Sequence, residues 1–212
     1  MLLGQYARLR IMDSGDGEYV RAVRNSPQVS RWLLERCFFI SDVQQREFVD
    51  SVAKDSKQMF FIAEDIQRNC PFGVYSLKYI DHRNQRAELG IFLEPGAASS
   101  GVVAFEAAVL VLDYGFDYLN LHKIVAEILA ENQRAIRLDE GLGLRLEGVR
   151  RRHAFYGGSF HDLLLYAVFR EDFRERPTDG VRLMRAGIAA AANRGEPSLS
   201  ASGCGEPCEP KT

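Results

Sequence analysis

Two places in the sequence join a strand-like run to a helix through small or polar residues. The stretch 96–101, GAASSG, precedes a long apolar segment, and Asn132 separates the apolar run 122–129 from a charged segment with helical spacing. Free backbone N–H groups and the helix dipole favour a phosphate at a helix N-terminus. Many strand–helix junctions use small residues, but two junctions after neighbouring strands can flank one extended, phosphorylated ligand.

These junctions need a sheet to hold them, and the sequence supplies its strands. Runs of β-branched and aromatic residues with polar turns between them predict three strands joined as an antiparallel meander. Two further strands meet at Gly157-Gly158, a dipeptide typical of a hairpin turn. The predicted strands are 6–11, 58–65, 71–80, 86–95, 122–129, 144–156 and 160–169.

Helical spacing marks the remaining segments of the domain. The region 13–55 is predicted to be helical, with Pro27 ending its first piece, a second piece over 29–37, and Ser41 as the N-cap of a third. The segment 102–120 is apolar on all sides, which predicts a long and mostly buried helix. A shorter helix over 132–141 is predicted to end at Gly141.

The chain of 212 residues, 46% of them hydrophobic, is long enough for one compact domain with a real core. The strands and helices predict one α/β domain over residues 1–173. From 174 to 212 there are few large apolar residues and many Gly, Ser, Pro and Ala. This composition predicts a mostly disordered tail, with one weak helical turn within 181–192.

Net charge and composition argue against some classes of binding partner. A net charge of −2 and a pI near 6.1 give no footprint for nucleic-acid binding. The basic cluster 150–153 is either a solvated strand end or a site for an anionic ligand. No segment is apolar for long enough to cross a membrane or to act as a secretory signal, so we expect a cytoplasmic protein without a membrane partner. Neither cysteines nor histidines have metal-ligand spacing, so no metal site is predicted.

Four segments occur in the order and spacing of a known family: RAELGIFLEP, LDYGFDYLNLHKIVAEILAENQRAIRL, GLGLRLEGV and HDLLLYAV. Over roughly residues 5–170 the chain resembles the GCN5-related N-acetyltransferase (GNAT) superfamily, within the branch of ribosomal-protein-alanine, spermidine and nucleotide-amino-sugar acetyltransferases. The resemblance implies an α/β GNAT fold, a mixed and mostly antiparallel sheet flanked by helices and splayed between its central strands. It also implies acetyl-CoA as co-substrate, lying in that split.

The resemblance places the pantetheine arm of acetyl-CoA along strand 88–93 and its pyrophosphate on the loop 99–104. Backbone amides can bind a pyrophosphate whatever the side chains are, provided that their N–H groups are free and point toward it. The family's loop usually begins with Arg or Gln and carries two or three glycines, whereas Val102 stands where a glycine is common, and its bulk favours weaker CoA binding. The implied cofactor-binding residues are Ile91, Phe92, Leu93, Ser99, Ser100, Gly101, Val102, Val103, Ala104 and Asn132.

Acetyl transfer to an amine needs a base that takes the proton of the amine. Glu88 lies in the strand that borders the reacting centre and is the candidate base, or else it orders a neighbouring loop. Where similar enzymes carry a tyrosine that protonates the leaving thiolate, this sequence has Asp139, a poor proton donor at neutral pH unless burial raises its pKa. Tyr156 and Tyr166 are candidate replacements, or else core or rim aromatics.

The N-terminal helices and the last hairpin are expected to select the acceptor. Trp32 either gives a flat apolar wall for a sugar or base or fills the core beneath its helix, and His82 and His161 are further acceptor-side candidates. A polyamine site would call for clustered carboxylates, whereas the mixed charges of 31–50 favour a nucleotide-linked sugar. The main hypothesis is therefore transfer to the primary amine of a small molecule, a nucleotide-linked amino sugar. The alternatives are a polyamine, a protein N-terminus, and a degenerate CoA-binding module without turnover. A monomer or homodimer is expected.

Overall fold

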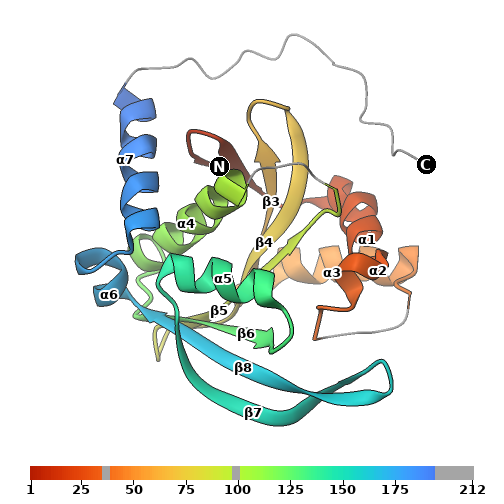
Figure 1. Cartoon of the computed structure of the whole chain (residues 1–212). Helices are drawn as coiled ribbons and strands as arrows, with labels where there is room; N and C mark the ends of the chain where they lie inside the picture. Colours follow the sequence, from red (N-terminus) through yellow and green to blue (C-terminus); the bar gives the residue numbers. More distant parts are fainter. Residues whose placement is uncertain (35–38, 97–100, 194–212) are drawn as a thin grey trace.

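The computed structural model describes residues 1–34, 39–96 and 101–193. Within these ranges, eight strands form one sheet in the order β1-β2-β3-β4-β5-β6-β8-β7 (Figure 1). All neighbouring strands are antiparallel except β5 and β6, which run parallel. The mixed, mostly antiparallel sheet predicted from the sequence is confirmed. The strands are β1 (Leu2–Leu3), β2 (Ala7–Ile11), β3 (Met59–Asp65), β4 (Cys70–Asp81), β5 (Arg86–Leu93), β6 (Lys123–Leu129), β7 (Arg145–Tyr156) and β8 (Ser159–Phe169).

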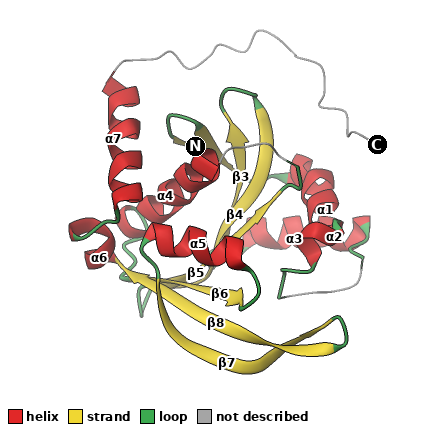
Figure 2. Cartoon of the chain, viewed as in Figure 1, coloured by secondary structure: helices red, strands yellow, loops and turns green. Residues whose placement is uncertain are grey.

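Helices flank both faces of this sheet (Figure 2). The group α1–α3 lies beside β3–β5, and α4 and α5 lie on the opposite face. Within the described ranges, no helix combines the length and the apolar character that crossing a membrane requires. The helices are η1 (Ser14–Asp16), α1 (Gly17–Asn25), α2 (Pro27–Ser30), α3 (Asp42–Lys54), α4 (Gly101–Asp117), α5 (Gln133–Leu142), α6 (Arg170–Glu175) and α7 (Asp179–Asn193).

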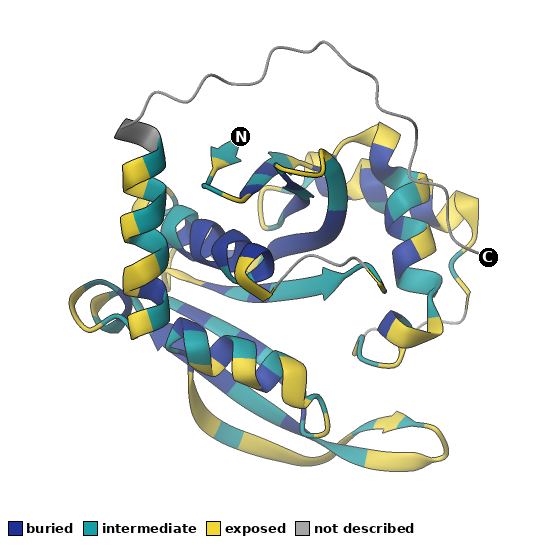
Figure 3. Ribbon diagram, turned by 45° about the horizontal axis from the view of Figure 1, so that its top comes forward, coloured by how far each residue is buried: buried dark blue, intermediate teal, exposed yellow. Residues whose placement is uncertain are grey.

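Side chains that alternate along the strands contribute to two separate hydrophobic cores. On β5, Ala87 and Leu89 belong to the main core around α4. On β4, Val74 belongs to a second, smaller core with Val20 of α1 and Val49 of α3. The middle of α4 is buried (Figure 3), because this helix is apolar on all sides and packs against the sheet, α5 and α7. Side chains at odd and even positions of β5 therefore face different layers.

The N-terminal helical region differs from the prediction in its middle. Ser41 caps α3 as expected, its Oγ accepting a hydrogen bond from the Gln44 N–H at 3.3 Å. The helix predicted over 29–37 is instead the four-residue α2, which starts at Pro27 and gives way to a turn at Arg31 and Trp32. Adjacent apolar residues at 32–34 cannot share one helical face, which explains the early end. The remainder, 35–37, lies outside the described residues.

The C-terminal prediction is wrong for the part of the tail that the structure describes. The helix α7 packs on the main core, with Val181 fully buried and Met184 and Ile188 partly buried. These three apolar residues recur at helical spacing within an alanine-rich segment whose composition hides them. Arg185 fixes the helix by donating to Asp113 Oδ1 at 2.9 Å and to the carbonyl of Phe173 at 3.0 Å. The folded part of the chain thus continues past residue 173, and 194–212 lie outside the described residues.

Candidate active site

The two parallel strands at the centre of the sheet pair over only a short distance. Among the described residues, β5 and β6 pair from Arg86 to Glu88 and from Lys123 to Val125. Both strands continue beyond this point, β5 to Leu93 and β6 to Leu129, while β5 stays paired with β4 and β6 with β8. The backbone of β5 beyond Glu88 therefore has a side without a strand partner. We call the place where β5 and β6 diverge the split.

Glu88 is the last residue of β5 that pairs with β6. Its partner across the sheet is Val125, and its carboxylate lies 2.9 Å from Lys78 Nζ on β4. The side chains of Glu88 and Lys78 are 18% and 21% exposed, so water still reaches both. By alternation Glu88 points to the α1–α3 side of the sheet, away from α4 and α5. A carboxylate is thus fixed at the split on one defined face.

The first turn of α4 is held against the sheet next to the split. The buried Tyr75 hydroxyl of β4 donates to the carbonyl of Ala104 at 2.8 Å. Val103 and Ala104 are buried, whereas Gly101 and Val102 are exposed, and a Cβ added to Gly101 would meet nothing within 4 Å. The start of this helix is therefore exposed at Gly101 and Val102. The predicted Ser99 and Ser100 lie outside the described residues.

The start of α5 is capped by its own asparagine. Asn132 Oδ1 accepts a hydrogen bond from the Ala135 N–H at 3.2 Å, so this oxygen already caps the N-terminus of the helix. The other end of α5 differs from the prediction. Gly141 lies inside the helix against Phe105, and Gly143 ends it with a left-handed φ of 93°.

Asp139 lies on the buried side of α5. It is 5% exposed, on the same helix face as Ile136 and Leu142, and burial raises its pKa from 3.8 to about 7. The helix runs back along β6 to the level of the split, because the Arg145 that follows pairs with Ala167, the β8 partner of Val125. Asp139 thus has the burial that a carboxylic acid needs to hold a proton near neutral pH.

Tyr166 of β8 lies beside Asp139 on the α5 side of the sheet. Burial, a 3.1 Å hydrogen bond to Glu140 Oε1 and the charge of Asp139 together raise the pKa of Tyr166. The buried carboxyl and this phenol are therefore electrostatically linked.

Comparison with known proteins shows which family the chain belongs to. A family model described as an acetyltransferase (GNAT) domain matches residues 7–145, well over half of the chain. The chain belongs to the GNAT acetyltransferase family. Acetyl-CoA is the co-substrate of this family, and the chain is accordingly an acetyl-CoA-dependent N-acetyltransferase.

Several relatives match over nearly their whole length. The spermidine N(1)-acetyltransferase of Escherichia coli K12 is 28% identical over 179 residues, covering 84% of this chain and 94% of the relative. The Vibrio cholerae enzyme of the same name is 27% identical over 171 residues, covering 79% and 95%. A crystal structure of the Vibrio cholerae enzyme with CoA and spermine superposes with a TM-score of 0.74 at 26% identity, covering 79% and 98%.

The hairpin residues predicted for the site lie away from the split of this acetyltransferase. Tyr156 and His161 stack on each other with ring centroids 3.7 Å apart, and His161 Nδ1 lies 2.7 Å from Glu131 Oε1. His161 is six residues along β8 from Ala167, the partner of Val125, which corresponds to roughly 20 Å at the rise of a strand. The structure therefore brings Glu88 and Asp139 to the level of the split, and leaves Tyr156 and His161 near the hairpin tip.

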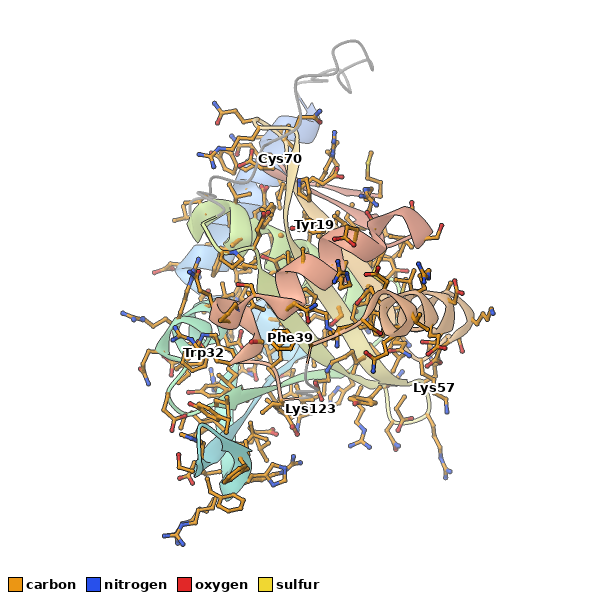
Figure 4. All side chains as sticks on the ribbon, turned by 90° about the vertical axis from the view of Figure 1, so that its right-hand side faces the viewer. Tyr19, Trp32, Phe39, Lys57, Cys70 and Lys123 are labelled. Atoms are coloured by element: carbon orange, nitrogen blue, oxygen red, sulfur yellow. The ribbon has the colours of Figure 1, made fainter. Side chains whose placement is uncertain are left out.

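The other acceptor-side candidates are also separated. His82 is exposed in the turn between β4 and β5. Trp32 is half-buried, belongs to neither core, and lies under the Arg31 guanidinium at 4.7 Å. Figure 4 views the molecule from the α1–α3 side, on which Trp32, the 87% exposed Phe39 and Lys123 are labelled. Trp32 thus lies on the α1–α3 side of the molecule and outside the two cores.

Sequence reasoning named Arg150 only within the basic cluster 150–153 and did not predict which cations pair with the carboxylates near the split. Besides Lys78, these are Lys123, whose Nζ lies 2.7 Å from Glu147 Oε1, and Arg150, whose Nη1 lies 2.7 Å from Glu127 Oε1. The available signal was alternation in KIVAEIL, where charged Lys123 and Glu127 lie on one face and apolar residues on the other.

Proposed function

We propose that this enzyme transfers the acetyl group of acetyl-CoA to a primary amine of a polyamine, with Glu88 as the base. The observation that carries the proposal is the position of Glu88, the last paired residue before β5 and β6 diverge, on the face that α4 and α5 leave free. Acetyl-CoA would lie in the split. An acceptor amine that approaches from the α1–α3 side then meets the carboxylate first.

The cofactor-binding role rests on free backbone groups. The β5 residues Ile91, Phe92 and Leu93 lie beyond Glu88, the last residue that pairs with β6. Their backbone is suited to hydrogen-bond the pantetheine arm on that side. The amides that begin α4, from Gly101 to Ala104, are suited to the pyrophosphate. Val102 is 45% exposed, so its side chain extends into solvent without displacing the helix start from the sheet.

The reaction is direct attack of the amine on the thioester. Glu88 takes the proton of the attacking ammonium, directly or through a water, and the neutral nitrogen forms the new bond to the acetyl carbon. The nitrogen, which is positively charged after the attack, then loses its second proton to water, and the carbon–sulfur bond breaks with its electron pair on sulfur. Glu88 releases the proton that it took to solvent. Asp139 donates the proton that the thiolate takes, a role compatible with its burial and with a pKa near 7. The carboxylate that remains regains a proton from solvent before the next turnover.

The relatives favour a polyamine over the nucleotide-linked amino sugar expected from the sequence. Both spermidine N(1)-acetyltransferases match over at least 94% of their own length. A protein N-terminus has weaker support, since a putative ribosomal N-acetyltransferase of Bacillus subtilis is 20% identical over 179 residues. One structure of the Vibrio cholerae enzyme is described as dodecameric, and for this chain a monomer or homodimer stays a prediction.

An acceptor panel tests the proposal. Release of free CoA thiol would be measured with the full chain and acetyl-CoA, using spermidine, spermine, a nucleotide-linked amino sugar, a peptide with a free N-terminus and n-butylamine. We expect the highest kcat/KM with spermidine or spermine. A higher value for the amino sugar or the peptide would reassign the acceptor. Acetyl-CoA binding by calorimetry with no thiol release for any amine would instead support the degenerate, non-catalytic module.

A further inference from the structure

Three carboxylate–cation pairs lie on the α1–α3 side of the sheet around the split. Glu88 pairs with Lys78 at 2.9 Å. Val125, the partner of Glu88, lies between Lys123 and Glu127 on β6, and side chains two residues apart on a strand share a face. Lys123 and Glu127 therefore point to the same side as Glu88. Lys123 pairs with Glu147, and Glu127 pairs with Arg150. In each pair the side-chain nitrogen lies 2.7 Å from the carboxylate oxygen.

The pair of Glu127 and Arg150 is the one suited to exchange its cation. Glu127 is 22% exposed in the middle of β6, which is paired with β8 along its whole length. Arg150 is 46% exposed on the edge strand β7, where the register shifts between Arg150 and Ala154. The carboxylate is thus held by the sheet and the cation is the exposed partner. An ion pair so exposed stabilises the fold only slightly, so its replacement costs little.

Lys123 is held more firmly than Arg150. Its ammonium contacts both oxygens of Glu147 and also lies 5.0 Å from the centre of the Phe169 ring. Within the described residues, Arg150 forms its ion pair with Glu127 alone. An external ammonium near the split therefore meets less competition at Glu127 than at Glu147.

The spacing of Glu88 and Glu127 matches an acceptor with two amines. Glu127 lies two residues past Val125, the partner of Glu88, where the strands have begun to part, so the two Cα atoms are at least about 8 Å from each other. A few methylene groups span this distance. We propose that Glu127 binds the non-reacting ammonium group of the acceptor in place of Arg150, and so determines the preference for polyamines over monoamines. This inference rests on the proposed transfer at Glu88.

Selectivity between two acceptors tests this role. The full chain would be assayed with acetyl-CoA and either spermidine or n-butylamine, and the selectivity is the ratio of the two kcat/KM values. We expect Glu127→Gln to lower this ratio at least tenfold, mainly through the KM for spermidine. Arg150→Met should raise the ratio several-fold, because it removes the internal competitor. Glu175→Gln, an exposed change at the end of α6, is the matched control and should leave the ratio unchanged.

The outcomes separate this inference from the proposed function. Equal loss with both acceptors in Glu127→Gln, together with an unchanged ratio in Arg150→Met, would overturn the role of Glu127. Absence of thiol release with either amine in the unaltered protein would overturn the proposed function itself. Arg150 is exposed, so Arg150→Met keeps the inference testable even if Glu127→Gln folds poorly.

Discussion

Lys78 and Glu88 face each other at 2.9 Å on neighbouring strands, at the last residue before β5 and β6 part. The ammonium holds the carboxylate in one place on the α1–α3 side of the sheet. Replacing Lys78 by Met leaves the base but removes its orienting partner. We expect kcat with spermidine to fall by roughly tenfold, the scale on which catalytic groups lose rate when slightly misplaced. An unchanged kcat, with the exposed Glu175→Gln of α6 as the control, would show that Lys78 does not orient the base.

Asp139 should give the rate a characteristic dependence on pH. Its pKa is raised to about 7 by burial, so the protonated form that can donate to the thiolate is lost as pH rises through about 7. The nearby titratable groups are Tyr166 of β8 and Glu140, next along α5. We expect Asp139→Asn to lower kcat at pH 6 and to remove the fall in kcat centred near pH 7. A variant that keeps both the rate and this fall would exclude Asp139 as the donor.

The same carboxyl should affect stability with a defined sign. The folded-state pKa lies above the unfolded value near 3.8, so the folded state binds more protons between these values. The stability that protonated Asp139 contributes is complete below about pH 4 and is lost as pH rises through about 7. Asp139→Asn should therefore be more stable than the unaltered protein at pH 8, by up to about 4 kcal/mol, with a smaller difference at pH 5. Denaturant unfolding at the two pH values measures this, and a constant difference would contradict it.

Glu106 anchors the N-terminal strands to α4. Its carboxylate is 1% exposed and accepts hydrogen bonds from the backbone N–H groups of Gln5, Tyr6 and Ala7 at 2.8, 2.7 and 2.7 Å. Glu106→Ala would leave these donors unpaired, which costs about 1–3 kcal/mol for each buried group. We expect a loss of about 3–5 kcal/mol in the free energy of unfolding. Glu47→Ala is the exposed control, and equal effects of the two changes would refute the anchoring role.

The helix α7 offers a matched pair of substitutions that tests its packing. Val181 is fully buried and Leu183 is 70% exposed on the same helix. We expect Val181→Ala to lower the free energy of unfolding by about 1–3 kcal/mol and Leu183→Ala to change it by less than about 0.5 kcal/mol. Indistinguishable effects in chemical denaturation would mean that α7 does not pack on the core in solution.

The segments with strong periodic patterns were predictable from the sequence. The buried α4, the antiparallel meander β3–β5 and the Ser41 cap follow from hydrophobic spacing and capping chemistry. Weak or mixed patterns led to errors. Gly141 and Gly143 both resemble helix ends, and only the observed left-handed φ at Gly143 distinguishes them. The three apolar residues of α7 were obscured by alanines.

The site itself depended on information that residue types do not carry. Glu88 could be nominated from its strand, but its pairing with Lys78 depends on register, which shifts between Lys78 and Asp81. The raised pKa of Asp139 depends on the burial of its face of α5, which no local sequence pattern indicates. Tyr156 was assigned to the site as a candidate proton donor, and His161 as an acceptor-side candidate on the last hairpin. Their distance from the split follows from the length of β8.

The most direct test of Glu88 is the maximal rate of CoA release with spermidine, comparing the unaltered protein with Glu88→Gln at saturating acetyl-CoA. Glutamine keeps the size of the side chain and removes the base, so we expect kcat to fall by roughly 100-fold or more. Calorimetry should give similar acetyl-CoA affinities for the two proteins, since the proposed cofactor contacts are made by other residues. A kcat within about twofold of the unaltered protein, with acetyl-CoA still bound, would contradict the assignment of Glu88 as the base.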